Sequence, residues 1–386
     1  MNDPLPFDSR CIRWRHGLMK PCQQRPNPSN TAHHPYSMVP EESTGGAAAS
    51  TDDDRADDPL RIVIQRVESR RLPHDRSSLL WDDGGLTPML GDSIDRWVAA
   101  MVKDDGILTP IEAALKNGTR RARVTARQAG VLCGVHVAER MLLNWAPHIN
   151  HSWLKREGDS LEDGQEFLIL EGNKHCILRI ERTLLNIIGR MSGIASNTRI
   201  WADLSGECQV AATRKTEWGL LDKWAVHVGG GLTHRLNRSD SLIIKENDIA
   251  ALRGADEKKN KDVVKRLIEN IDIEKHGRFI VIEVSSLAEA MAAGKAWCTR
   301  VLDLEVKPRL VIMLDNFGPE KTRDAVLDLD SHGYLEWCFV EASGNILFED
   351  LAKWSKTGAN VLSTSALNRG VPPIDISLML DAAIGG

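Results

Sequence analysis

Apolar residues recur at helical spacing in two segments of the chain. One face of residues 92–102 is apolar, and a longer pattern over residues 175–203 predicts a long amphipathic helix. The small residues at 192–196 interrupt the bulky side chains of this second helix, so another backbone could approach it closely there. Residues 121–133 and 166–170 have the character of strands, and together these segments predict an ordered α/β region.

From residue 208 onward, short apolar runs alternate with amphipathic helices. The runs occupy residues 208–212, 241–245, 279–284, 310–314, 336–340 and 360–363, and the helices lie near 263–274, 287–301, 319–329 and 347–354. Apolar strands that alternate with helices are typical of parallel sheets covered on their outer faces. Several runs end in polar residues, which predicts an α/β barrel with a site at the carboxyl ends of its strands. A doubly wound open sheet is the alternative, although no GxGxxG or Walker A sequence accompanies it.

The first 78 residues differ in composition from the rest. Proline, serine, threonine, glycine and alanine alternate there with acidic clusters. Such a stretch buries too little apolar surface to offset the entropy that ordering would cost. We therefore expect residues 1–78 to form a disordered extension, with ordered sequence beginning near Trp81.

Composition and charge argue against several classes of protein. The chain has 386 residues, 42% of them hydrophobic, and a net charge of −5, which permits a proper core and argues against a nucleic-acid partner. No apolar run approaches the roughly 20 residues of a membrane helix, and no secretory signal is expected. Seven cysteines without CxxC spacing indicate reduced thiols in the cytoplasm, and they argue against a disulfide framework or a zinc site.

Basic residues gather where the apolar runs of the second half end. Arg214 and Lys215 follow the first run, His234 and Arg235 follow a triple glycine, and Lys245 ends the second run. Carboxylates and phosphates need several cations, and an arginine can clamp a carboxylate with two parallel hydrogen bonds. The spacing therefore predicts a pocket for a small ligand that carries several negative charges.

Acidic and small polar residues end the later runs. Glu283 and Asp315 are carboxylates suited to ribose hydroxyls and to Mg²⁺, which prefers oxygen ligands. Ser343 and Gly344 form a turn whose backbone N–H groups suit phosphate. Each feature also has a plainer interpretation, because the acids could cap helices and the serine-glycine pair could be an ordinary turn.

Nine short motifs occur in an order that identifies a family resemblance. They are Glu181-Arg182-Thr183-Leu184-Leu185-Asn186, Ser192-Gly193-Ile194-Ala195, Thr213-Arg214-Lys215-Thr216, Gly229-Gly230-Gly231-Leu232-Thr233-His234-Arg235, Ile244-Lys245-Glu246-Asn247, Ile282-Glu283-Val284, Met313-Leu314-Asp315-Asn316, Glu341-Ala342-Ser343-Gly344 and Val371-Pro372-Pro373-Ile374-Asp375-Ile376. With them the chain resembles the quinolinate phosphoribosyltransferase family, the decarboxylating nicotinate-nucleotide pyrophosphorylases of NAD biosynthesis.

The resemblance implies an architecture and an activity. It implies an N-terminal α/β sandwich domain over residues 79–205, an open α/β barrel over residues 206–374, and a segment at 375–386 that packs back on the first domain. The implied reaction transfers phosphoribosyl from phosphoribosyl pyrophosphate to quinolinate, with loss of CO₂, to give nicotinate mononucleotide and pyrophosphate. The resemblance also implies Mg²⁺ as cofactor and a homodimer or larger assembly with shared active sites.

The resemblance also implies roles for individual residues. Catalysis is assigned to Lys215, Glu283 and Asp315, and magnesium binding to Glu283 and Asp315. Substrate binding is assigned to Arg182, Thr213, Arg214, Lys215, His234, Arg235, Lys245, Glu283 and Asp315, and phosphate binding to Ser343, Gly344, Asn345, Thr364 and Ser365. Arg182 is expected to reach the site of the partner subunit, although it could simply be a charge on a helix surface.

Departures from the family pattern keep two other functions open. The segment at 217–221 lacks a proline and an arginine that the family has, and Asp248, Ser365 and the pair at 368–369 also differ. The chain could therefore be a paralogue that acts on another aromatic acid or nucleobase-like acceptor. A non-catalytic binding protein on the same fold is the third possibility, and the intact Lys215, Glu283 and Asp315 argue against it.

Overall fold

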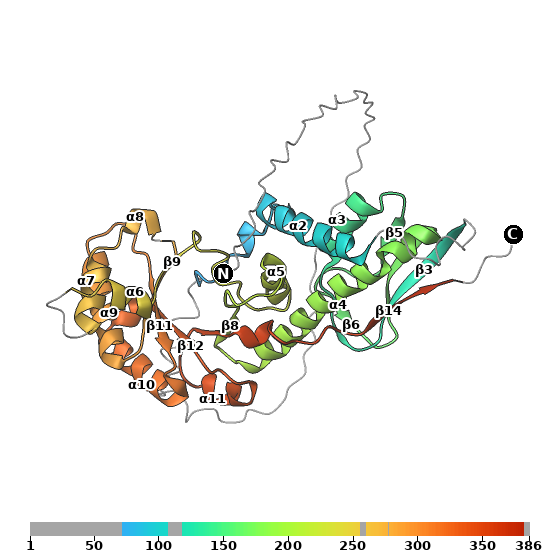
Figure 1. Ribbon diagram of the computed structural model, residues 1–386. Coiled ribbons are helices and arrows are strands. Elements are labelled where there is room, and N and C mark those ends of the chain that lie inside the picture. Colours follow the sequence, from blue (N-terminus) through green and yellow to red (C-terminus); the bar gives the residue numbers. More distant parts are fainter. Residues whose placement is uncertain (1–71, 107–117, 255–259, 277, 382–386) are drawn as a thin grey trace, which may run out of the picture. The chain divides into compact units, whose positions relative to one another are not determined.

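A parallel sheet and a separate antiparallel sheet organise the protein. The computed structural model describes residues 72–106, 118–254, 260–276 and 278–381 (Figure 1). Within these ranges, six strands form one parallel sheet and four others form an antiparallel sheet. The predicted α/β architecture with two differently built domains is confirmed.

The antiparallel sheet joins strands from both ends of the described chain. Its order is β14 (Ile376–Leu380), β3 (Thr119–Ala126), β7 (Glu166–Asn173) and β5 (Asn150–Trp153). Val124 of β3 lies opposite Leu378 of β14, so the end of the chain returns to the first domain. Smaller antiparallel pairs are β1 (Trp81–Asp82) with β2 (Gly85–Leu86), and β4 (Gly130–Val131) with β6 (Ser160–Leu161).

Three helices accompany this sheet. The two predicted helices are present as α2 (Pro88–Asp105) and α4 (Lys174–Leu204). Thr87 caps the first, because its hydroxyl accepts a hydrogen bond from the Leu90 N–H, and the proline at the first position suits a helix start. A further helix, α3 (Val135–Trp145), was not predicted from the sequence.

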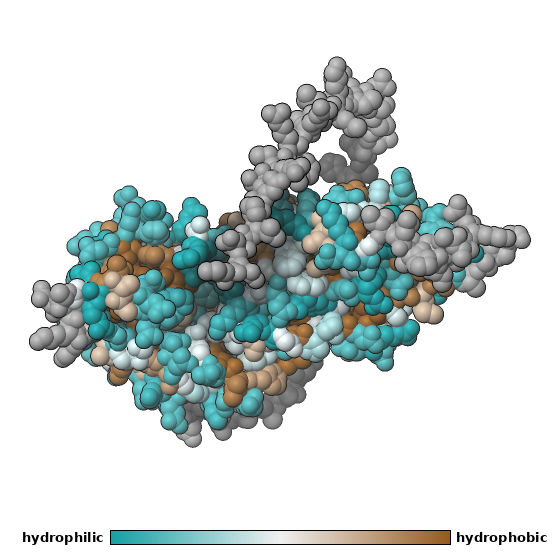
Figure 2. Space-filling model, viewed as in Figure 1, coloured by the Kyte–Doolittle hydropathy of each residue, from teal (hydrophilic) through white to brown (hydrophobic). Residues whose placement is uncertain are grey.

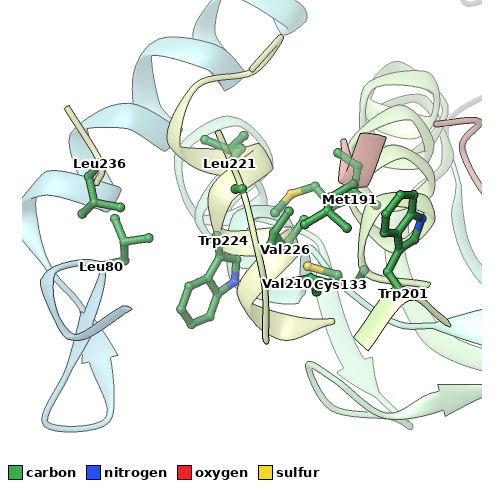
Figure 3. Close-up of a cluster of buried hydrophobic side chains, with 14 of the residues drawn as sticks. Leu80, Cys133, Met191, Trp201, Val210, Leu221, Trp224, Val226 and Leu236 are labelled. Carbon is green, nitrogen blue, oxygen red and sulfur yellow. The ribbon is translucent and has the colours of Figure 1, made fainter. Parts of the chain in front are cut away.

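Helix α4 carries apolar side chains that pack in more than one direction. Met191 and Trp201 of this helix meet Trp224 and Val226 of α5 (Leu220–Val228) in one buried cluster (Figure 3). Fifteen residues of α4 are buried, including most of the predicted apolar stripe. The helix therefore links the antiparallel sheet to the barrel through its own packing.

Gly193 lies where α4 meets another segment of backbone. A Cβ atom built at this position would lie 2.3 Å from the Pro372 carbonyl oxygen. One turn earlier, the Gly189 carbonyl accepts a hydrogen bond from the Ile374 N–H at 3.0 Å. The close backbone approach predicted from the small residues at 192–196 is thus present, and it anchors the segment that leads to β14.

Replacing Gly193 with alanine is expected to lower the free energy of unfolding by about 1–3 kcal/mol, because the added methyl group overpacks a contact made by backbone. Urea unfolding of the variant would measure this loss. Asn186→Ala on the exposed side of the same helix is the control and should change stability by less than about 0.5 kcal/mol. Equal stability of the two variants would contradict the assigned contact.

The parallel sheet is an open barrel. Its order is β8 (Gln209–Ala211), β13 (Val361–Ser363), β12 (Cys338–Ser343), β11 (Leu310–Asp315), β10 (Ile280–Val284) and β9 (Leu242–Ile244). Helices cover the outer side, among them α7 (Asn260–Glu269), α9 (Leu287–Val301), α10 (Gly318–Ser331) and α11 (Leu351–Trp354) (Figure 1). Strands β8 and β9 form the two edges, and these edges are not hydrogen-bonded to each other.

Two boundaries predicted in this domain are wrong. The strand expected at 336–340 begins only at Cys338, because Tyr334–Glu336 forms a 3-10 helix in front of it. The helix expected at 263–274 divides into α7 and the short α8 (Ile273–His276). Helix α5 after the loop that follows β8, and helix α6 (Glu246–Ala251), which begins two residues after β9, were not anticipated.

Residues 72–78 contradict the predicted length of the N-terminal extension. Leu72 is 8% exposed and His74 is fully buried. Leu72 belongs to a second apolar cluster formed by inward-facing barrel residues such as Val281, Val311 and Phe339. These seven residues are therefore part of the folded domain, whereas residues 1–71 lie outside the described ranges.

The described surface gives no sign of a membrane span. None of the helices placed by the structure is long and apolar enough to cross a membrane. Hydrophilic side chains cover much of the face in Figure 2, with smaller hydrophobic areas between them. The most exposed large apolar residues, such as Leu143 and Val306, come from different elements.

Candidate active site

A cavity of about 480 Å³ opens at the carboxyl ends of the parallel strands. Every residue assigned to the site from the sequence lines it except Arg182. The lining comprises Thr213, Arg214, Lys215, His234, Arg235, Lys245, Glu283, Asp315, Ser343, Gly344, Asn345, Thr364 and Ser365, and also Ile243, Met313, Asn316, Ile346 and Ser363, which were not assigned. The topology explains this gathering, because the ends of parallel strands meet at one rim of a barrel.

The cations of the cavity are largely uncompensated. Arg214 and Lys215 are exposed on the loop after β8, and neither has a carboxylate partner within the part of the chain that the structure describes. Burial lowers the pKa of Arg235, and the neighbouring charges of Arg214 and Arg238 lower it further. Crowded positive charges raise the free energy of the empty site, so an anion that enters it relieves their repulsion.

Carboxylates lie across the same cavity on neighbouring strands. Glu283 and Asp315 share the inner face of β10 and β11, where Glu283 pairs with Met313. Lys245 Nζ lies 2.5 Å from Glu283 Oε2, and Asn316 Nδ2 donates to Asp315 Oδ2 at 2.8 Å. Both groups offer oxygen atoms alone, which fits a hard cation such as Mg²⁺.

Asp248 has a local structural role. Its carboxylate accepts a hydrogen bond from the Lys245 N–H at 2.9 Å and completes a capping box at the start of α6. Such a cap satisfies a backbone donor at the helix end and fixes the entry of the chain. This departure from the family pattern therefore holds the backbone of Lys245 at the edge of the cavity.

The turn after β12 has an unusual backbone. Gly344 has a φ of 88° and Asn345 a φ of 51°, while Asn316 on the neighbouring loop has a φ of 57°. Asn345 Nδ2 donates to Asn316 Oδ1 at 3.0 Å, directly over the glycine. A Cβ atom on Gly344 would lie 2.2 Å from Asn316 Oδ1, so only glycine fits between these loops.

Gly344→Ala is expected to weaken binding of a phosphorylated substrate about tenfold or more, because the two loops must separate to admit a methyl group. The Michaelis constant for phosphoribosyl pyrophosphate would measure this effect. Gly318→Ala is the matched control, since Gly318 also has a positive φ (75°) but no atom within 4 Å of its added Cβ. Equal effects in both variants would show that backbone strain alone is responsible.

A buried network holds the loop that carries Lys215. Asn368 is fully buried, and its Nδ2 donates both to the Lys215 carbonyl at 3.0 Å and to Asp222 Oδ2 at 3.1 Å. Arg190 binds the same Asp222 at 3.1 Å from α4. Asn368 stands at a position where the sequence departs from the family, and here it fixes the backbone of Lys215, the lysine that the sequence predicts to be catalytic.

The same arginine fixes the segment after this loop, where the sequence departs from the family. Arg190 lies 2.9 Å from Glu217 and places its guanidinium 4.9 Å from the centre of the Trp218 ring. Trp218 also stacks near Trp97 of α2, with ring centres 6.3 Å apart. The tryptophan thus packs against the first domain and does not line the cavity. Sequence reasoning identified the departures at 217–221 but not Arg190, which lacks any motif of its own.

His234 contributes to the cavity wall, but its ring nitrogens are already used. Its Nε2 lies 3.1 Å from Glu341 Oε1, and its Nδ1 accepts a hydrogen bond from the Arg235 N–H at 2.7 Å. The residue has a φ of 52° and is 5% exposed. In this arrangement the ring offers no free nitrogen to a ligand, and it supports the backbone of Arg235. Direct substrate binding by His234 stays a prediction.

Arg182 is the one assigned residue outside the cavity. It lies on the exposed side of α4 and does not contribute to the cavity lining. Its assignment to the site of a partner subunit stays a prediction.

Comparisons with known proteins agree with the architecture. Sequence models of the two domains of quinolinate phosphoribosyl transferase match the chain, the N-terminal domain over residues 107–192 and the C-terminal domain over residues 194–379. A probable carboxylating nicotinate-nucleotide pyrophosphorylase of Methanothermobacter thermautotrophicus is 34% identical over 294 residues, which cover 74% of this chain and 97% of the relative.

A plant relative and a solved structure extend the comparison. The chloroplastic carboxylating nicotinate-nucleotide pyrophosphorylase of Arabidopsis thaliana is 33% identical over 265 residues, covering 67% of this chain and 73% of the relative. The structure of the nicotinate-nucleotide pyrophosphorylase of Francisella tularensis superposes with a TM-score of 0.64 at 27% identity, covering 75% of this chain and 97% of that one.

Proposed function

The chain belongs to the quinolinate phosphoribosyltransferase family, and from this premise we propose that its cavity transfers phosphoribosyl to quinolinate with decarboxylation. The observation that carries the proposal is the division of charge within one cavity. Arg214, Lys215 and Arg235 supply cations for an aromatic dicarboxylate, while Glu283 and Asp315 supply carboxylates for a ribose. A cavity of about 480 Å³ suits substrates of this size.

The first step needs positioning and charge stabilisation. The ring nitrogen of quinolinate forms a bond to C1 of the ribose while the bond from C1 to pyrophosphate breaks, and both electrons of that bond leave with the pyrophosphate. Arg214 and Arg235 would clamp the carboxylates so that the nitrogen faces C1. Lys215 would act as a point charge beside the leaving group or a carboxylate. The carboxylates of Glu283 and Asp315 would stabilise the positive charge that develops on the ribose.

Magnesium has a fitting set of oxygen ligands in the cavity. Glu283 and Asp315 would hold it, together with oxygens of phosphoribosyl pyrophosphate. When bound, the ion neutralises charge on the pyrophosphate as it leaves. Lys245, which now pairs with Glu283, would then be released toward a phosphate or carboxylate.

Decarboxylation follows from the chemistry of the new bond. Once the ring nitrogen is quaternary, it withdraws electrons from the adjacent ring carbon. The carboxylate on that carbon leaves as CO₂, its bonding electrons remain on the carbon, and a proton from solvent replaces it. The site assists by binding the carboxylate that stays on the ring. It also assists because it no longer stabilises the carboxylate that leaves as CO₂.

The proposal also includes a homodimeric assembly and a cytoplasmic location for the protein. A homodimer in which each subunit lends Arg182 to its partner would account for the exposed place of this residue on α4. The described cysteines are free thiols, which fits a reducing cytoplasm.

A comparison of acceptors tests the proposed reaction. Purified protein would be mixed with phosphoribosyl pyrophosphate, Mg²⁺ and either quinolinate, nicotinate or another aromatic acid, and nucleotide products would be quantified. Nicotinate mononucleotide formed from quinolinate alone is the expected result. Turnover only with another acid would support a retuned specificity, and binding without turnover would support a non-catalytic role.

A further inference from the structure

The segment from Leu72 to Arg76, here called the strap, bridges the two edges of the open barrel. On one side, the Arg76 N–H donates to Thr233 Oγ1 at 2.8 Å, next to Leu232, which pairs with Ala211 of edge strand β8. On the other side, the Arg76 guanidinium binds Asp240 at 2.7 Å, shortly before edge strand β9. Leu72 packs in the apolar cluster inside the barrel. The strap therefore closes the side of the barrel that is open between edge strands β8 and β9.

The side chain of His74 is buried inside the barrel. Its ring is fully buried, with Phe279 at 5.0 Å and His234 at 5.1 Å between ring centres. His74 Nε2 lies 2.9 Å from Glu341 Oε2, while His234 Nε2 lies between the two oxygens, 3.1 Å from Oε1 and 3.2 Å from Oε2. Two imidazoles thus share one carboxylate that has no exposed surface.

The hydrogen-bond pattern fixes the tautomer of the neutral His234 ring. The Nδ1 atom of His234 accepts the Arg235 N–H, so its Nε2 must carry the proton that is donated to Glu341. A buried carboxylate is stable only with such donors, and His74 provides a second donor, 2.9 Å from Oε2. Burial opposes ionisation of Glu341, but the two imidazoles outweigh it and hold the pKa of this carboxyl well below its usual range.

We propose that His74 is a positioning residue for the quinolinate site, acting through Glu341 and His234 on Arg235. The inference rests on the proposed function, because Arg235 is one of the two arginines assigned to the substrate carboxylates. His74 fixes the orientation of Glu341, Glu341 fixes the tautomer and plane of His234, and His234 fixes the backbone N–H of Arg235. Loss of the first link removes the shorter of the two contacts to Oε2 and leaves His234 Nε2 as the single donor shared by both oxygens of a buried carboxylate.

The proposal assigns a function to residues that precede both matched domains. The matches to the family begin at residue 107, whereas the strap ends at residue 76. The quinolinate clamp of this chain would therefore depend on a segment outside those domains. The loss of His74 should weaken binding of the acceptor, quinolinate, because the side chain of His74 contacts Glu341, on the path to Arg235.

Substitutions at His74 in the full chain provide the test. His74→Phe keeps the ring and its packing on Phe279 but removes the donor to Glu341. We expect the Michaelis constant for quinolinate to rise about tenfold, with kcat and the Michaelis constant for phosphoribosyl pyrophosphate changing less than about threefold. His74→Gln, whose amide can donate from nearly the same place, should restore most of the affinity. His136→Phe replaces a histidine outside the strap and should behave as wild type.

Two further measurements test the path of the effect. In a Glu341→Gln background, His74→Phe should add little, because residues that act through one another are not additive. Spectra of ¹⁵N-labelled imidazoles should show His234 protonated at Nε2 in the wild type and disturbed in His74→Phe. This second readout does not depend on turnover, so it tests the strap even if quinolinate is not the substrate.

Three results would overturn the proposal. The first is a folded His74→Phe protein with unchanged quinolinate affinity and an unchanged His234 spectrum. The second is full additivity with Glu341→Gln. The third is stoichiometric zinc in the purified wild type that is lost in His74→Phe, since the buried His74, His234 and Glu341 would then be metal ligands and not hydrogen-bond partners. Absence of quinolinate turnover in the wild type, by contrast, would count against the proposed reaction alone.

Discussion

Replacing Lys215 with alanine is expected to lower turnover about 10²- to 10³-fold, because one preorganised charge is lost where charge develops in the transition state. The melting temperature should stay close to that of the wild type. Lys215 is exposed on the loop after β8, and its backbone, not its side chain, makes the bonds to Thr213 and Asn368. The loop should therefore keep its shape without the ammonium group, and kcat measured at saturating substrates would report the loss.

Two variants sharpen this experiment. Lys215→Arg keeps the charge but spreads it over a planar group, so we expect partial activity between the wild type and the alanine variant. Lys265→Ala removes a lysine whose side chain is 62% exposed on α7 and should leave turnover unchanged. A Lys215→Ala protein with kcat within about twofold of the wild type would remove this residue from the catalytic set.

Mixing two inactive proteins is expected to restore activity if Arg182 serves the partner subunit. Arg182→Ala and Lys215→Ala proteins should each be nearly inactive. After exchange of subunits, about half of the dimers are mixed, and each mixed dimer holds one site with both defects and one site with neither. The ceiling is about a quarter of wild-type activity for random exchange between dimers. The recovered rate, measured after exchange has been verified by mass spectrometry of labelled subunits, would test the shared site.

A second pair of proteins serves as the control for this mixture. Lys215 and Glu283 line the same cavity of one subunit. A mixture of Lys215→Ala and Glu283→Gln proteins should therefore stay inactive, since every site in a mixed dimer carries one defect. If the Arg182 mixture also fails to recover, Arg182 acts within its own subunit or the active form is a monomer.

The sequence predicted those parts of the fold whose pattern is local. Helix α4 was expected at 175–203 and occupies Lys174–Leu204, because its apolar stripe repeats at helical spacing over its whole length. Helix α9 has the expected bounds for the same reason. Strand ends could be placed as well, since a continuous apolar run stops where Lys245 or Asp315 begins a polar segment.

Other parts depend on tertiary contacts that no local pattern reveals. The strap reads as a polar segment, and only the open edge of the barrel gives His74 a buried partner. Helix α5 (Leu220–Val228) has nine residues, too few for its apolar spacing to stand out in the sequence. Arg190 lies within a predicted helix, and its link to Asp222 and Glu217 joins elements that are distant in the sequence.

Quinolinate labelled in the carboxylate next to the ring nitrogen offers the most direct test of the central claim. With phosphoribosyl pyrophosphate and Mg²⁺, the protein should release labelled CO₂, pyrophosphate and unlabelled nicotinate mononucleotide in equal amounts. The same mixture with Lys215→Ala should show a large and parallel loss of all three products. A nucleotide that retains the label, or wild-type protein that binds quinolinate and forms none of the three products, would contradict the proposed reaction.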